Sequence, residues 1–314
     1  MNAPVCWLSR IEAYLTYRRS LGFQLTQAGG TLRQFARFAD SRGEARLTIA
    51  LAAQWARTSP RQTPITWARR IEVLRGFAQF CLRTDPTTEI PPSDLLGRAH
   101  RRLVPHIYTP AELVALLDAA RTLSPRNGLR PLTCQTVLGL LAASGLRISE
   151  ALTLKRADVD IHAGILTIRE AKFHKSRGIP VHPTVTAALR AYAERRDQIV
   201  ARTTCEAFFV FDRGRPLHQY DILYALQRLC RDLGLQPRGD YPHHRLHDMR
   251  HSFIVQSTLR TYERSQTPDH AVQALSTYVG HAKVTDTYWY FTGIPALMEL
   301  TAARFQAYAQ GEPL

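Results

Sequence analysis

The chain has 314 residues with a hydrophobic fraction of 45%, and its 41 lysines and arginines against 26 aspartates and glutamates give a formal net charge of +15. This length permits two domains with cores of their own, and the composition excludes fibrous and disordered proteins. We expect neither a secretion signal nor a membrane helix, because no apolar run approaches the roughly 20 residues that cross a bilayer. The excess of positive charge favours a polyanionic partner, most simply nucleic acid.

The five cysteines and the choice of basic residue add two further expectations. Cysteines lie far apart and form no CxxC pair, which indicates buried thiols in a reducing cytoplasm and disfavours a disulfide framework or a zinc ribbon. All but four of the basic residues are arginines. Arginine suits bidentate contacts with phosphate, although a GC-rich genome would produce the same preference for arginine.

Residues 1–90 are predicted to form a helical domain. Apolar side chains recur at helical spacing in residues 7–22, 32–43 and 65–83. The first 104 residues contain 16 basic and 7 acidic side chains, so the positive charge is concentrated there. The candidates for DNA contact are arginines that lie off the apolar stripe or in the following basic run: Arg69, Arg70, Arg75, Arg101 and Arg102. A solvated bundle surface would have the same pattern.

Residues 91–108, with three prolines, a glycine and a basic run, are predicted to be a linker. A second domain then occupies residues 109–314. It opens with Thr109, Pro110 and Glu112, the pattern of a helix capping box. Further segments are predicted from their patterns: helices at 110–121, 131–143, 184–198, 219–233, 245–260, 270–278 and 296–309, strands at 164–170 and 177–181 around a polar turn, and an isolated buried strand at 208–211. The fold class is therefore mainly α with a small antiparallel β-sheet.

Polar side chains of the second domain occupy positions where a plain hydrophobic core would not need them. Arg147 follows a glycine turn among apolar neighbours, with Glu150 one helical turn later, and a mostly buried arginine requires a carboxylate or a phosphate. Two arginines, a lysine and two histidines suit a phosphodiester, and a tyrosine is a nucleophile that forms an ester with it. The set comprises Arg147, Lys172, His247, Arg250, His281 and Tyr290.

Together and in this order, these residues resemble the tyrosine recombinase or phage integrase family. The matching motifs are GLRISE (145–150), the lysine of a β-hairpin turn in AKFHKSRGIPV, HDMR (247–250), VGH (279–281), and a tyrosine nine residues after that histidine. They cover about residues 109–292, and residues 1–90 resemble the family's core-binding domain. The resemblance implies that the six residues are catalytic, that Glu150 supports them, and that the two domains form a C-shaped clamp around DNA.

Two departures from the family pattern leave alternatives open. The hairpin turn lacks the usual glycine, so Lys175 competes with Lys172 for the role of general acid. Residues 260–270 are predicted to be an inserted loop. A zinc helix formed by His247 and His251 is disfavoured, because Arg250 would lie near the metal and no third ligand is evident. We expect neither a metal nor a cofactor.

The resemblance further implies a reaction and its partners. Tyr290 would attack a scissile phosphate to give a 3′-phosphotyrosyl intermediate, in the integration, excision or transposition of a mobile element. The partners would be double-stranded DNA with inverted-repeat sites, a homotetramer with a dimer on each site, and partner recombinases; the 296–309 helix would be exchanged between protomers. The place of action would be the bacterial nucleoid. The alternatives are an inactive DNA-binding accessory protein of the same fold and a type IB-like topoisomerase.

Overall fold

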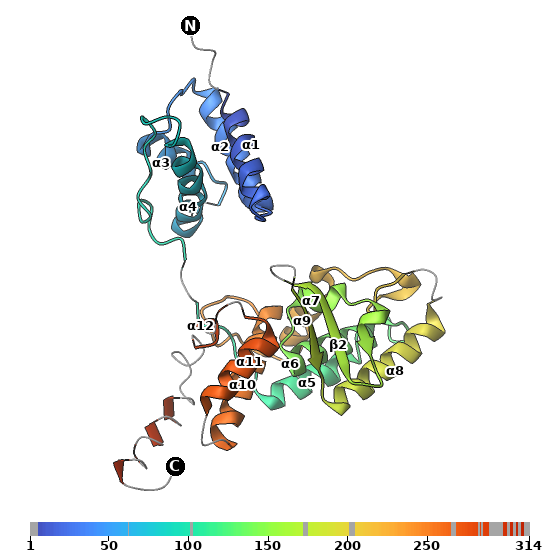
Figure 1. Cartoon of the computed structure of the whole chain (residues 1–314). Helices are drawn as coiled ribbons and strands as arrows, with labels where there is room; N and C mark the ends of the chain where they lie inside the picture. Colours follow the sequence, from blue (N-terminus) through green and yellow to red (C-terminus); the bar gives the residue numbers. More distant parts are fainter. Residues whose placement is uncertain are drawn as a thin grey trace. The chain divides into compact units, whose positions relative to one another are not determined.

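The computed structural model describes residues 6–61, 63–100, 103–171, 175–200, 205–264 and 268–281, and positions 283, 285–288, 298, 299, 302, 303, 306, 309 and 310. The chain divides into two compact units, Met1–Arg102 and Leu103–Leu314. Figure 1 labels the helices of both units and the strand β2.

The first unit is a helical bundle built around aromatic side chains. Its helices are α1 (Trp7–Ser20), α2 (Thr26–Ser41), α3 (Ile49–Arg57) and α4 (Pro64–Cys81). α1 lies beside α2 and α3 beside α4 (Figure 1). In the core, the ring of Phe35 meets Trp7 at 5.6 Å and Trp55 at 5.3 Å, both edge to face, an arrangement that aromatic pairs favour. The sequence pattern predicted three of these helices and missed α3.

The expectation that Arg70 lies on a polar face is wrong. Its side chain is buried, its guanidinium lies 4.1 Å from the centre of the Trp55 ring, and Nη1 donates to the carbonyl of Ala56. Helical periodicity was misleading here because the partner that covers Arg70 comes from another helix. Arg69 is exposed and donates to the carbonyl of Ala99, whereas Arg75 is half-buried and donates to the carbonyl of Pro91.

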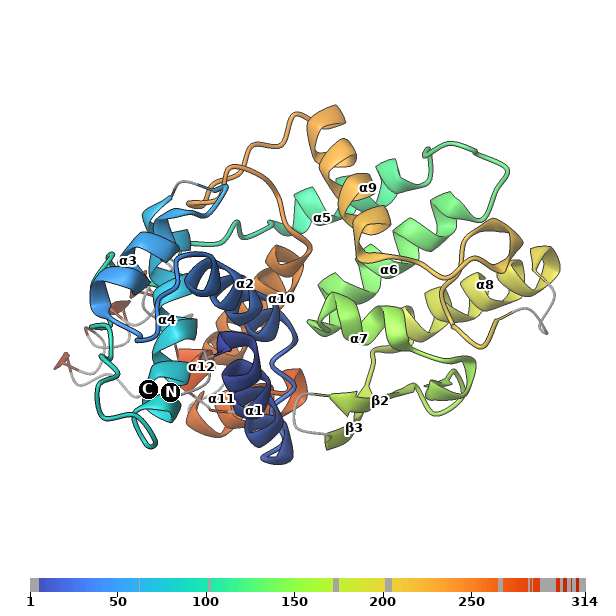
Figure 2. The same cartoon turned by 90° about the horizontal axis from the view of Figure 1, so that it is seen from above.

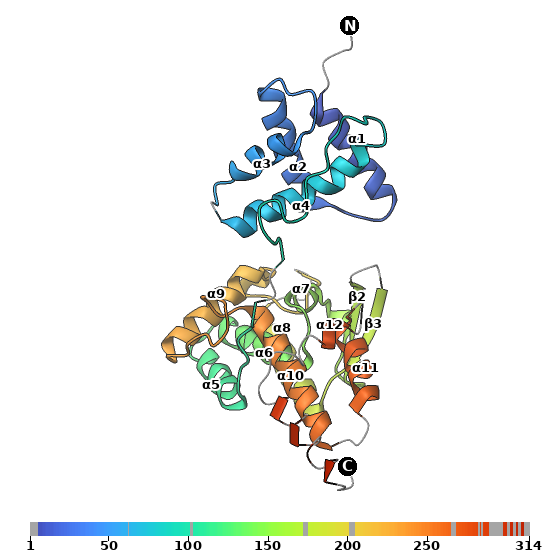
Figure 3. The same cartoon turned by 90° about the vertical axis from the view of Figure 1, so that its left-hand side faces the viewer.

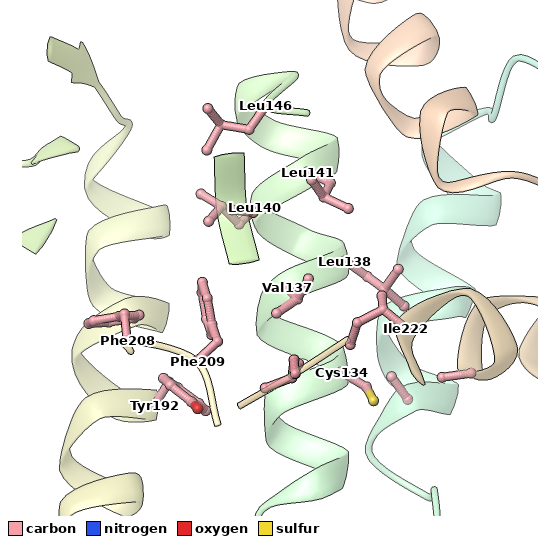
Figure 4. Close-up of a cluster of buried hydrophobic side chains, with 14 of the residues drawn as sticks. Cys134, Val137, Leu138, Leu140, Leu141, Leu146, Tyr192, Phe208, Phe209 and Ile222 are labelled. Carbon is pink, nitrogen blue, oxygen red and sulfur yellow. The ribbon is translucent and has the colours of Figure 1, made fainter. Parts of the chain in front are cut away.

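The second unit packs around helix α6 (Arg130–Ser144), which contacts α5 (Pro110–Ala120), α7 (Ile148–Thr153), α8 (Pro183–Ile199), α9 (Gln219–Asp232) and α10 (Leu246–Arg264). Apolar side chains therefore surround α6. Figure 4 shows Tyr192, Phe208 and Phe209 on one side of it and Ile222 of α9 on the other. Two further helices, α11 (Pro268–Val279) and α12 (Thr285–Tyr288), follow α10, and Figure 2 shows α10 and α11 from above.

A three-stranded antiparallel sheet in the order β1-β2-β3 completes the second unit. Its strands are β1 (Val159–Asp160), β2 (Ile165–Ala171) and β3 (Lys175–Pro180). The register pairs Ile168 with Arg177, and the pairing becomes irregular between Ile168 and Ala171. This sheet confirms the predicted fold class. The strand β3 lies beside α11 (Figure 3), where Arg177 donates to the carbonyls of Tyr278 and Val279.

The structure corrects two predicted segments of the second unit. The loop predicted at 260–270 is wrong for the residues that the structure describes, because α10 continues to Arg264 and α11 begins at Pro268. Residues 208–211 are buried but make only an isolated bridge, Val210 with Pro216, instead of a strand. The predicted helix at 296–309 lies mostly outside the described residues.

The predicted linker, residues 91–108, is divided between the two units. Residues 91–100 lie against the first unit, through the carbonyls of Pro91 and Ala99 that accept from arginines of α4. Residues 103–108 lie against the second unit, where the backbone N–H of Asp240 donates a hydrogen bond to the carbonyl of Val104. Gly239 makes this approach close, since a Cβ there would lie 2.2 Å from the carbonyl oxygen of Val104.

Two findings bear on the environment of the chain. Within the described residues, no helix is both long and apolar enough to cross a membrane. All five cysteines are free, and Cys81, Cys134 and Cys230 are buried.

Burial of His106 makes the stability of the second unit depend on pH. His106 is 2% exposed, and its Nδ1 accepts from the backbone N–H of Arg238. Burial, with the positive charge of Arg238 and the neighbouring His244, lowers the pKa of His106 to about 4. The unfolded chain takes up this proton near the ordinary value of 6.5, so the contribution to stability is complete above pH 6.5 and is lost as the pH falls toward 4.

We expect the free energy of unfolding to fall more steeply with acidification in the wild type than in His106→Gln, by about 1 kcal/mol per pH unit between pH 6.5 and 4. Glutamine can still accept from the Arg238 N–H but does not titrate. Urea denaturation of both proteins at several pH values measures the difference. Equal slopes for the two proteins would contradict the assignment.

Candidate active site

Arg147 and Glu150 form the first part of the site, at the start of α7. The Glu150 carboxylate accepts from the Arg147 backbone N–H at 3.0 Å and from Arg147 Nη1 at 2.8 Å. This places an acidic side chain in the first helical turn, where it satisfies an otherwise unpaired N–H. The side chain of Glu150 is 7% exposed and that of Arg147 is 29% exposed, so the guanidinium is held in place yet remains accessible.

Arg177 of β3 is the second cation on Glu150. Its Nη1 donates to one carboxylate oxygen at 3.1 Å and its Nη2 to the other at 3.0 Å. Burial alone would raise the pKa of Glu150, but the hydrogen bonds from Arg177 and from the Arg147 N–H, with the charges of both arginines, hold that pKa below its usual value. Glu150 is therefore an anion that binds two arginines.

Arg250 is the most deeply buried arginine of the site. Its side chain comes from α10 and is 2% exposed; Nη1 donates to the carbonyl of Gly145 at 2.6 Å and Nη2 to that of Val279 at 2.8 Å. Gly145 ends α6 with φ +60°, and a Cβ there would lie 2.4 Å from a ring carbon of Phe253. The glycine therefore permits both the left-handed turn and the close packing of α6 on α10.

His247 lies one helical turn before Arg250, and its ring meets that of His251 edge to face at 4.5 Å. Surrounding protein atoms displace water from the ring, and this desolvation is the largest cause that lowers the pKa of His247 to about 4. The positive charges of Arg250, Arg245 and Arg147 lower it further. His247 is nevertheless solvent-exposed in part. It is thus neutral at pH 7 in the free protein, and a bound phosphate would raise its pKa by offsetting the arginine charges.

His281 follows the C-terminal end of α11. Its Nδ1 lies 2.7 Å from the hydroxyl of the buried Thr287, and its backbone N–H donates to the carbonyl of Ser276. Gly280, with φ +69°, makes the turn between the helix and this histidine. The contact with Thr287 orients the imidazole and links it to α12. This helix ends at Tyr288, two residues before position 290.

The end of α11 receives three arginines from three other elements. Carbonyls near the C-terminus of a helix have no partner within it and carry a partial negative charge. Arg147 donates to the carbonyl of Gly280 at 3.1 Å, Arg250 to that of Val279, and Arg177 to those of Tyr278 and Val279 at 3.3 and 3.4 Å. α7, β3 and α10 are thereby joined at one point.

The structure brings together four of the six residues that the sequence singles out as catalytic: Arg147, His247, Arg250 and His281. Lys172 and Tyr290 lie outside the described residues, as do Arg101 and Arg102. Lys175 begins β3.

Sequence reasoning missed Arg177, Thr287 and the pair formed by Arg245 and Asp248. Arg245 Nη2 donates to the fully buried Asp248 carboxylate at 2.6 Å, and this contact fixes the first turn of α10 beside His247. The sequence offered one signal for Arg177. Glu150 alone would cancel the charge of Arg147, so a site that must stay positive needs a second cation near Glu150. Periodicity could not show it, because a cation in a short strand resembles an ordinary solvated residue.

The arrangement has the properties of a site for a phosphodiester. The side chain of Arg147 is 29% exposed, so a ligand can reach it. Fixed arginines and imidazoles can bind nonbridging oxygens and stabilise the charge that develops on them. Within the described residues, no cluster of three or more His, Cys, Asp or Glu side chains is placed to hold a metal ion.

Known proteins resemble this chain along most of its length. A model of the phage integrase family matches residues 107–293. The putative integrase/recombinase y4rB of Sinorhizobium fredii is 40% identical over 300 residues, covering 94% of this chain and 96% of that protein. The tyrosine recombinase XerC of Alcanivorax borkumensis is 27% identical over 225 residues, covering 72% of this chain and 68% of its own.

Solved structures share the fold. The XerH recombinase bound to palindromic difH superposes with a TM-score of 0.66 at 18% identity, covering 96% of this chain and 86% of that one. The Tn1549 transposon integrase in complex with transposon right end DNA superposes with a TM-score of 0.69 at 17% identity, covering 97% and 100%. The chain belongs to the phage integrase family of tyrosine recombinases.

Proposed function

We propose that this protein is a site-specific DNA recombinase that cuts and rejoins DNA strands through a phosphotyrosyl intermediate, in the integration, excision or transposition of a mobile element. The observation that supports this most directly is the joining of Arg147 and Arg250 to the end of α11, immediately before His281. Both guanidinium groups contact the turn that leads into His281, an arrangement that suits a scissile phosphate.

In the proposed reaction, Tyr290 Oη attacks the phosphorus atom and loses its proton. The bond from phosphorus to the 5′-oxygen breaks, and the leaving oxygen takes a proton from Lys172 or Lys175, which gives a 3′-phosphotyrosine and a 5′-hydroxyl. Because the new ester retains the energy of the phosphodiester, attack by the 5′-hydroxyl of another strand reverses the step without ATP.

The arginines and histidines act on the phosphate during both steps. Arg147 and Arg250 bind the nonbridging oxygens, and removal of one such donor typically costs about 10²–10³ in rate. His281, oriented by Thr287, donates a hydrogen bond to the phosphate. His247 is neutral before DNA binds, because burial and nearby arginines lower its pKa to about 4, so it is able to accept the proton of the nucleophile.

The proposed partner is double-stranded DNA with inverted-repeat sites, bound by a dimer on each site and by a tetramer during strand exchange. The arginine-rich first unit grips the duplex from its exposed face, which includes Arg69. Half-buried Arg75 donates to a backbone carbonyl, and buried Arg70 contributes to the core. Exchange of the 296–309 segment between protomers would connect the active sites of the tetramer, and the place of action would be the nucleoid.

The first experiment removes the proposed nucleophile. Tyr290→Phe should abolish covalent trapping on a nicked suicide substrate while leaving DNA affinity unchanged, because only the attacking oxygen is lost. Denaturing gels detect the adduct, and gel shifts measure the affinity. Tyr288→Phe, two residues earlier, is the matched control and should still form the adduct. The assignment fails if Tyr290→Phe is trapped and Tyr288→Phe is not.

DNA binding should depend steeply on salt, because a protein with a net charge of +15 must displace many counterions from the duplex. Between roughly 50 and 200 mM salt, we expect the affinity to fall by about 10³-fold or more, the loss anticipated for 6–10 phosphate contacts. Fluorescence anisotropy with a labelled duplex measures the slope. A nearly flat dependence would contradict a clamp that grips phosphates.

Deletion of 296–314 tests the proposed exchange between protomers. The truncated protein should bind a single half-site as the full chain does, but it should neither pair two sites cooperatively nor recombine them. Gel shifts with one and two half-sites separate these steps. If the truncated protein assembles tetramers on DNA as well as the full chain, the segment does not connect protomers.

A further inference from the structure

Arg177 provides a second positive charge for Glu150. The carboxylate is 7% exposed and binds Arg147 Nη1 at 2.8 Å and Arg177 Nη1 and Nη2 at 3.1 and 3.0 Å. One carboxylate between two guanidinium groups leaves a net charge of +1 on the cluster. With Arg177 absent, buried Glu150 would depend on Arg147 alone, and the pair would be neutral. Arg177 thus preserves positive charge beside the phosphate position.

Arg177 also fixes the backbone that leads into His281. Its Nε and Nη2 donate to the carbonyls of Tyr278 and Val279. Its guanidinium also lies against Gly280, where a Cβ would be 2.7 Å from Cζ. The neighbouring carbonyl of Gly280 holds Arg147. A shift of Arg177 would therefore move the turn on which both Arg147 and His281 depend.

We propose that Arg177 is a positioning residue for strand cleavage, which aligns Arg147 and leaves its positive charge only partly offset, by sharing Glu150 and by holding the end of α11. This inference rests on the proposed function. Arg177 acts through Arg147 and His281 and need not touch the phosphate. Its planar fork of five N–H groups serves four acceptors at once, which the single ammonium of lysine cannot do.

Substitutions separate the two contributions. Arg177→Met keeps the length of the side chain and removes charge and donors. Arg177→Lys restores the charge and loses the fork. Arg177→Met combined with Glu150→Gln removes the buried carboxylate whose charge Arg147 would otherwise neutralise. The matched control is Arg156→Met, because Arg156 has a similar exposure, 22% against 18%, and also forms a salt bridge, with Asp197 of α8.

The measurement is the single-turnover rate of covalent adduct formation on nicked duplex DNA, with affinity from gel shifts and folding from thermal melting. We expect Arg177→Met to cleave about 10- to 100-fold more slowly, the cost of a small misplacement of reacting groups, with affinity changed less than threefold. Arg177→Lys should lie between it and the wild type. The double variant should cleave faster than Arg177→Met, and Arg156→Met should cleave as the wild type does.

The outcomes distinguish this inference from the proposed function. A wild-type protein that forms no adduct contradicts the proposed function itself. If the wild type forms the adduct and Arg177→Met does so within twofold, or if Arg156→Met loses as much rate, the positioning role is wrong. A double variant no faster than Arg177→Met overturns the sharing of charge. Should Arg177→Met fail to fold, Arg177→Lys decides the question, since a rate equal to the wild type would exclude a need for the fork.

Discussion

The site depends on the unpaired carbonyls at the C-terminal end of α11. A helix leaves its last carbonyl groups without partners, and they must be satisfied from outside. Here the partners are side chains of Arg147, Arg177 and Arg250, which come from the start of α7, from β3 and from α10. The same contacts that complete the helix therefore place the cations of the site. The packing of four elements is fixed by one local requirement.

Concentrating arginines in this way has an electrostatic cost that a substrate can relieve. Like charges at close range raise the free energy of the unliganded protein. Glu150 offsets part of it, and the surrounding protein atoms and three neighbouring arginines lower the pKa of His247, which disfavours another positive charge there. A phosphodiester brings the missing negative charge. The site is thus arranged for an anion before that anion arrives, which is how preorganised groups lower a barrier.

The sequence predicted those parts of the site that can be recognised from the type of residue and its spacing along the chain. Arg147 with Glu150 one turn later, and His247 with Arg250, share local helical geometry, so their relation could be inferred from the chain alone. Arg177 depends on a contact between a strand and the end of a distant helix, and no local pattern encodes it. The helices and the small sheet of the second unit could also be predicted, because the pattern of apolar side chains that indicates them is local in the sequence.

The wrong predictions have the same physical origin. Arg70 lies off the apolar stripe of its own helix, yet Trp55 of another helix covers it. Residues 260–264 are polar enough for a loop, but α10 continues through them, because a polar sequence does not by itself end a helix. The sequence pattern therefore fails to predict the burial of a side chain when a residue distant in the sequence covers it.

Two glycines connect these levels. Gly145 and Gly280 each end a helix with a positive φ, and each comes within two residues of a proposed catalytic side chain, Arg147 or His281. Neither position has room for a Cβ, because a ring carbon of Phe253 would lie 2.4 Å from one and Arg177 Cζ 2.7 Å from the other. Their carbonyls, turned outward by the left-handed conformation, accept from Arg250 and Arg147 respectively. The carbonyl of the glycine that ends each helix thus binds an arginine from another element. In the motifs GLR and GH, the glycine backbone therefore positions the site, in addition to the proposed catalytic side chains beside it.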